Sequence, residues 1–202
     1  MGRSSRKQAD ENRLRVVKAA TGLFITQGIE SVGIADVMKA AGMTQGGFYR
    51  HFTSKDVLAA EACGYAFKRA AEIWDQVARD AVAKNRDPLD AVISFYLSTK
   101  PAILTCPMVA FAADAAPRSV DDPLRAAYDN GVRTLFDAFA NYAAPRRSAG
   151  ALQDVRALFA AMVGSNVLAR SGHDQSWSTP PKRIVAPGKG VGKLGPNARK
   201  RT

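Results

Sequence analysis

The sequence is poor in the residues on which catalysis, metal binding and disulfide formation usually depend. It has two cysteines, Cys63 and Cys106, and two histidines, His51 and His173, and these four residues show no metal-ligand spacing. Two cysteines are also too few for a disulfide framework. We find no glycine-rich phosphate loop and no nucleophile motif. The sequence therefore predicts a protein that is not an enzyme and uses no metal or cofactor.

Long apolar runs are missing as well. No stretch reaches the roughly 18–20 apolar residues that a membrane-spanning helix needs. The N-terminus is basic, but no apolar segment follows it, so it does not have the pattern of a secretory signal. We therefore expect a cytoplasmic protein without a membrane partner.

Acidic residues are fewer than basic ones, 18 against 29, and the formal net charge is +11. The excess is uneven, because residues 170–202 carry eight Lys and Arg against one Asp, a net of +7, which leaves +4 for residues 1–169. The tail over 171–202 also holds four prolines and five glycines and has no helical period. We expect this basic tail to be disordered.

Residues 31–55 contain the most informative pattern in the chain. Apolar residues at helical spacing predict a short helix over Ile34–Ala41, and Gly42 follows it as a residue suited to a left-handed helix end. Thr44 can cap a second short helix over Gln45–His51. Two short helices joined by a tight turn are typical of a helix-turn-helix, whose second helix enters the DNA major groove.

The run over residues 41–55, AGMTQGGFYRHFTSK, followed by Leu58, resembles the signature of TetR/AcrR transcriptional regulators. This resemblance implies an all-α fold with a palindrome-binding homodimer as the active form. It implies a three-helix DNA-binding domain over 10–54 and a helical effector-binding and dimerisation domain over 55–170. The polar residues 1–9 predict a flexible arm, and the tail over 171–202 departs from the family pattern. The family usually places Thr or Ser at the start of the helix at Ile34, where this chain has Ser31-Val32-Gly33. Ser31 or the Gly33 N–H would have to replace that phosphate contact.

Residues in and around the second helix divide by their expected roles. Gln45 and Arg50 have side chains suited to base edges. Gly46 and Gly47 are poor helix formers, which suggests close approach to the DNA. The resemblance assigns phosphate contacts to Tyr49 and His51. Lys55 lies where a helix N-terminus would help it bind phosphate. The predicted DNA-binding residues are Thr44, Gln45, Gly46, Gly47, Tyr49, Arg50, His51 and Lys55.

Further helices are expected in the second domain, and the resemblance places an effector pocket and a dimer interface among them. The predicted helices cover about 55–84, 88–98, from 107 onward, 123–142 and 152–169, and the last two are the candidates for a dimer-forming bundle. The family usually has one more helix after these, which this sequence lacks. Candidate pocket residues, all equally compatible with plain core packing, are Trp74, Phe95, Tyr96, Cys106, Met108, Phe111 and Tyr128.

The leading interpretation is a dimeric repressor that binds double-stranded operator DNA and is released by a small-molecule effector. One alternative is a thiol sensor using Cys106, because a cysteine at a helix N-terminus can be reactive; the competing role for Cys106 is ordinary packing. Another is a nonspecific nucleic-acid-binding protein that depends on the basic tail.

Overall fold

The computed structural model describes residues 2–98, 106–143, 149–172 and 175–178, and within these ranges the chain is helical, without β-strands. The predicted all-α class is therefore confirmed. None of the described helices is both long and apolar enough to cross a bilayer. The elements are α1 (Gly2–Gln27), α2 (Ile34–Ala40), the 3-10 helix η1 (Gln45–Arg50), α3 (Lys55–Ala83), α4 (Pro88–Leu97), α5 (Pro107–Ala110), α6 (Ala112–Ala115), α7 (Pro123–Tyr142), α8 (Ala149–Ser171) and the 3-10 helix η3 (Gln175–Ser178).

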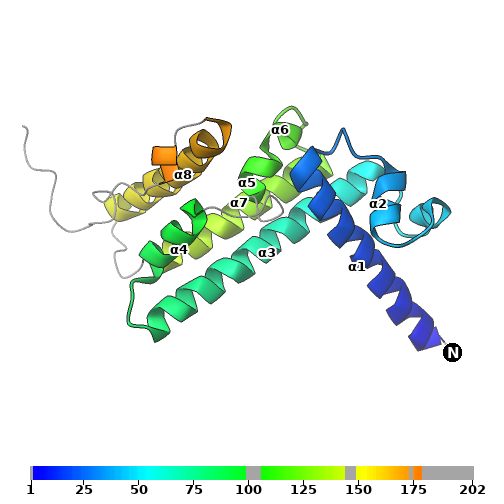
Figure 1. Ribbon diagram of the computed structural model, residues 1–202, viewed down its shortest axis with the longest axis horizontal. Coiled ribbons are helices and arrows are strands. Elements are labelled where there is room, and N and C mark those ends of the chain that lie inside the picture. Colours follow the sequence, from blue (N-terminus) through cyan, green and yellow to red (C-terminus); the bar gives the residue numbers. More distant parts are fainter. Residues whose placement is uncertain (1, 99–105, 144–148, 173–174, 179–202) are drawn as a thin grey trace, which may run out of the picture.

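Helix α3 runs through the molecule as its longest element (Figure 1). Helices α1 and α2 and the 3-10 helix η1 gather at one end of α3, and we call these three elements the head. Helices α4 and α8 lie towards the other end, and α7 packs along α3 more extensively than any other helix does. The head and the remaining helices therefore meet on α3.

Polar caps set the starts of three helices, as the sequence predicts. The Ser54 hydroxyl accepts a hydrogen bond from the Val57 N–H (3.2 Å) at the start of α3. The Asp87 carboxylate accepts one from the Asp90 N–H (2.9 Å) at the start of α4. Asp122 accepts hydrogen bonds from two backbone N–H groups at the start of α7. Such caps satisfy donors that have no partner inside the helix.

The structure differs from the sequence-based expectation at the N-terminus. Residues 1–9 were expected to form a flexible arm, but α1 already begins at Gly2. The stretch after Gly2 has no helix breaker, and its side chains form helical pairs. Lys7 and Glu11 make an ion pair, and Gln8 Nε2 donates to Asn12 Oδ1. These contacts support a helix where polarity alone suggested a loose segment.

Two further helices are shorter or tighter than expected. The second helix of the helix-turn-helix is the 3-10 helix η1 rather than an α-helix, and it contains two poor helix formers, Gly46 and Gly47. The helix expected from Pro107 splits at Phe111 into α5 and α6, each of four residues. Most of the predicted tail lies outside the described residues, which within it cover only 171–172 and 175–178.

The α3–α7 contact is tight enough to require a glycine. Gly131 of α7 is buried, and a Cβ atom built there would lie 2.2 Å from two ring atoms of Phe67 on α3. The same Phe67 ring packs edge-on against Tyr128, one turn earlier on α7, with centroids 5.7 Å apart. The missing side chain at Gly131 therefore makes the space that the Phe67 ring occupies.

We predict that Gly131→Ala lowers the free energy of unfolding by about 1–3 kcal/mol, because the new methyl group overpacks the Phe67 ring. Gly64→Ala on α3 is the matched control, since a Cβ there meets no atom within 4 Å. Gly64→Ala should stabilise the protein by up to about 1 kcal/mol, because alanine has a higher helix propensity than glycine. Denaturant unfolding of both variants measures this, and equal stability of Gly131→Ala and wild type would contradict it.

Candidate DNA-binding interface

The turn between α2 and η1 is built around Gly42. This residue has a φ of +68°, its N–H donates to the Lys39 carbonyl (3.0 Å), and the next N–H, of Met43, donates to the Met38 carbonyl (2.8 Å). This pair of bonds is the Schellman arrangement that ends a helix at a left-handed residue. Arg15 of α1 donates to the Ala41 carbonyl (2.7 Å) and so holds the turn against α1.

The start of α2 is capped without a side-chain hydroxyl. Gly33 occupies the N-cap position, and its N–H donates to the Asp36 carboxylate at 3.0 Å. In the DNA-free protein this N–H is therefore already engaged, while Ser31 is exposed. Lys55 lies close by, with its ammonium 3.5 Å from the Glu30 carbonyl oxygen. The structure thus brings the predicted phosphate-binding lysine next to the start of α2.

Helix η1 has one anchored side and one open side. Phe48 is fully buried and stacks on the buried Phe52, with ring centroids 5.6 Å apart, so both are core residues. Tyr49, the next residue, is 72% exposed. The structure places the predicted DNA-binding residues on or beside this short helix: Thr44, Gln45, Gly46, Tyr49 and Arg50 are exposed, and Gly47, His51 and Lys55 are partly exposed.

Thr44 lies at the N-cap position of η1, as predicted, but its hydroxyl makes no capping hydrogen bond. The Thr44 backbone satisfies a donor at the start of η1 instead, because its carbonyl accepts a hydrogen bond from the Gly47 N–H at 3.0 Å. The Thr44 side chain is therefore exposed beside Gln45 and not committed to the helix end.

The head is attached to α3 by contacts that spacing along the chain did not indicate. Arg13 of α1 pairs with Glu61 of α3 through two hydrogen bonds, and its guanidinium lies 4.4 Å from the centroid of the Phe52 ring. The hydrogen bond with Glu61 is the main cause that raises the pKa of Arg13. The buried Thr21 hydroxyl donates to the Val17 carbonyl and faces the Ala62 carbonyl of α3. These contacts orient η1 relative to α3.

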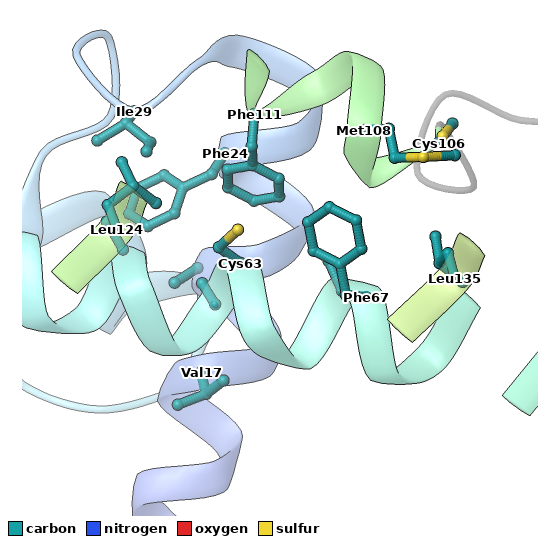
Figure 2. Packing of buried hydrophobic residues seen from close by; sticks show 14 of the residues in the cluster. Val17, Phe24, Ile29, Cys63, Phe67, Cys106, Met108, Phe111, Leu124 and Leu135 are labelled. Carbon is teal, nitrogen blue, oxygen red and sulfur yellow. The ribbon is translucent and has the colours of Figure 1, made fainter. Parts of the chain in front are cut away.

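The residues predicted to form an effector pocket do not all lie together. The Tyr96 ring packs edge-on against Trp74, with centroids 5.8 Å apart, and the Tyr128 hydroxyl donates to the Met108 carbonyl at 2.8 Å. Phe111 lies on the other side of Phe67 from Met108 and Cys106, near Phe24 and Cys63 (Figure 2). Phe95 is partly buried against the core. Phe111 therefore belongs to the packing between α5, α1 and α3.

The two cysteines occupy different environments. Cys63 is fully buried in α3, and burial raises the pKa of its thiol to about 12, in keeping with a packing role. Cys106 is 8% exposed and stands at the N-cap of α5, a helix of four residues. Burial raises the pKa of Tyr96, and the neighbouring Cys106 thiol adds to this shift. The described part of the chain has no group of three or more His, Cys, Asp or Glu residues that could hold a metal ion.

The structure has two short helices joined by a tight turn, anchored by buried aromatic residues and followed by a long helix. This arrangement defines a helix-turn-helix protein with a helical second domain. The model of the family "Bacterial regulatory proteins, tetR family" matches residues 16–62, which comprise most of the head and the start of α3. Over these residues the chain is therefore similar to the tetR family of bacterial regulatory proteins.

Two relatives are similar to part of this chain. The HTH-type transcriptional regulator AcrR of Shigella flexneri is 38% identical over 61 residues, which are 30% of this chain and 28% of the relative. A HTH-type transcriptional regulator of Staphylococcus aureus strain USA300 is 32% identical over 109 residues, 50% of this chain and 56% of the relative. The matches thus span about a quarter to a half of these relatives' lengths.

Solved structures share the fold over most of the chain. The reduced form of Escherichia coli NemR superposes with a TM-score of 0.67 at 18% identity and covers 83% of this chain and 92% of that one. A TetR transcriptional regulator of Chloroflexus aurantiacus superposes with a TM-score of 0.62 at 25% identity, covering 85% and 90%. The likeness therefore extends beyond the head into the second domain.

We predict that Gly42→Ala destabilises the protein by about 1–2 kcal/mol, because a residue with a Cβ pays that cost at a left-handed φ. The new Cβ would also lie 3.1 Å from the Arg15 guanidinium. Gly42→Asn should lose less, since Asn tolerates this conformation. Thermal and denaturant unfolding measure both variants, and equal losses would argue against a backbone origin.

Proposed function

We propose that the protein is a transcriptional repressor that binds a palindromic operator as a homodimer and leaves it when a small molecule binds the second domain. The observation that carries the proposal is the two-sided character of η1. Phe48 fixes the helix to the core, while Gln45, Tyr49 and Arg50 stand exposed in one short element. Exposed Gln and Arg side chains can form paired hydrogen bonds with adenine and guanine, and Tyr can contact phosphate.

The two glycines of η1 support close approach of a partner. A Cβ at Gly46 would meet no atom within 4 Å, and one at Gly47 would make an ordinary contact with Met38 at 3.6 Å. Neither residue has a positive φ. The fold would therefore accept alanine at both positions, and the absence of side chains serves something outside the chain. DNA would occupy that space when η1 enters the major groove.

The proposed dimer interface is on α8. The apolar side of α7 is turned inwards, where Leu124, Leu135 and Phe139 are fully buried within the chain. By contrast, α8 has two adjacent exposed apolar residues, Val167 (39%) and Leu168 (47%). Such residues on a helix are suited to burial against a second copy. These exposures support α8 as the interface helix, whereas the sequence suggested that both helices together form the dimer bundle.

The direct test is titration of the protein with the DNA upstream of its own gene, with competitor DNA at two salt concentrations. We expect specific binding to a palindrome and the same specificity for a form cut after Arg170. Gln45→Ala and Arg50→Ala should each cost about 1–3 kcal/mol at one base position and relax the preference there. Lys55→Ala should weaken binding to all sequences and lower the salt slope by about one.

Gly46→Ala is the sharpest control in this set, because it should preserve stability and still weaken operator binding. Binding that lacks sequence preference and disappears with the tail would instead favour the nonspecific alternative, which is driven by charge.

A route for the effector response leads through Arg118, in the loop between α6 and α7. Its guanidinium donates to Asp56 in the first turn of α3 (2.8 Å) and to Asp122, the cap of α7 (3.2 Å). These hydrogen bonds raise the pKa of Arg118. Asp56 lies one residue after Lys55, so a shift of the α6–α7 loop would act directly on the junction between head and α3. We propose that the effector changes operator affinity through this contact.

We predict that Arg118→Ala and Asp56→Ala each weaken operator binding and that the double variant is no weaker than the single ones. The coupling in this double-mutant cycle should be about 0.5–1 kcal/mol, because the Asp56 side chain is mostly exposed and the pair is screened by water. Asp121→Ala in the same loop is the control. Fully additive losses would show that the ion pair does not transmit to the DNA-binding residues.

A further inference from the structure

A polar residue interrupts the buried apolar face of α8. Phe159 and Met162 are buried, and Asn166 follows them at helical spacing on the same side of the helix. Phe159 packs against Trp74 and Phe139, with ring centroids 6.4 and 5.3 Å apart. An aliphatic residue at position 166 would continue this apolar face, so the amide needs an explanation.

Only half of the Asn166 amide is satisfied. Its Nδ2 group donates to the backbone carbonyl of Tyr96, at the long distance of 3.4 Å. Its Oδ1 atom is buried and accepts no hydrogen bond from any described residue. An amide oxygen has two lone pairs, and leaving a buried acceptor unmatched costs free energy that an apolar side chain would not cost. This atom therefore points to a hydrogen-bond donor that is not part of the described chain.

The neighbourhood of Asn166 restricts the chemistry of that donor. The amide lies at the C-terminal end of α4, where the buried Tyr96 ring packs on Trp74. A tyrosine phenol is uncharged at neutral pH, and burial raises the pKa of Tyr96 further. Aromatic rings, together with an unmatched acceptor, suit a flat uncharged molecule with an N–H or O–H group.

We propose that Asn166 Oδ1 binds the effector, an uncharged aromatic compound that donates one hydrogen bond to this atom while its ring packs among the aromatic residues near Trp74. This inference rests on the proposed function, because it identifies the class of effector for the same second domain. Neither spacing nor the family resemblance marked Asn166, and the only signal in the sequence is a polar residue within an apolar helical period.

The experiment compares phenol with anisole, its methyl ether, which has the same ring but no donor. Trp177→Phe leaves Trp74 as the single tryptophan, so its fluorescence reports binding near the site, and the melting temperature gives a second readout. Phenol should quench Trp74 and raise the melting temperature, with an affinity about tenfold above that of anisole, as expected for one hydrogen bond to a buried acceptor.

Asn166→Leu should reduce the affinity for phenol to that for anisole. Asn166→Ala, which adds no bulk, should show the same loss of preference. Asn130→Leu, the same change at an exposed position of α7, is the matched control and should bind phenol like the wild type.

Three results would overturn the inference: no binding of phenol at millimolar concentration, equal affinity for phenol and anisole, or a preference for phenol that survives in Asn166→Leu. Operator binding is measured separately on the same proteins. Its loss would refute the proposed function, whereas loss of the preference for phenol alone would refute this inference.

Discussion

The contact between α3 and α7 is the constraint on which the other parts depend. At Gly131 the two helices approach so closely that the Phe67 ring occupies the place of a side chain. Close-packed interiors of this kind respond to change by moving as units rather than by deforming smoothly. Because α1 packs on the start of α3 and α4 packs further along it, any displacement of α7 relative to α3 alters the position of the head relative to the second domain.

The head can transmit such a displacement because side chains of α1 hold it directly to α3 and to the turn after α2. Arg13 joins α1 to Glu61 of α3 and also covers the Phe52 ring, so the base of η1 and the helix beneath it are held by one side chain. Arg15 holds the turn after α2. The exposed side chains of η1 therefore move together with α3 and not independently of it. A small rotation of α3 would therefore reorient η1.

Stability and function make different demands at particular residues. Gly131 is required by the fold, since the Phe67 ring fills its space, whereas Gly46 has open space around it and would cost nothing to replace. Asn166 places an unmatched polar atom among aromatic residues, where an apolar side chain would pack without penalty. Residues that the fold does not need, or that work against it, are the ones that indicate a partner.

The sequence by itself determined the all-α class, the starts of α3, α4 and α7, the left-handed turn at Gly42 and the composition of η1. These features are local, because caps, helical periods and turn residues act within a few positions of the chain. The extension of α1 to Gly2, the 3-10 form of η1 and the division between α5 and α6 were not predicted. The pairs Arg13–Glu61, Arg118–Asp56 and Asn166–Tyr96 join residues 48, 62 and 70 positions apart. Only the tertiary structure decided these, because the packing of α1, α7 and α8 against their neighbours brings together side chains that no spacing relates.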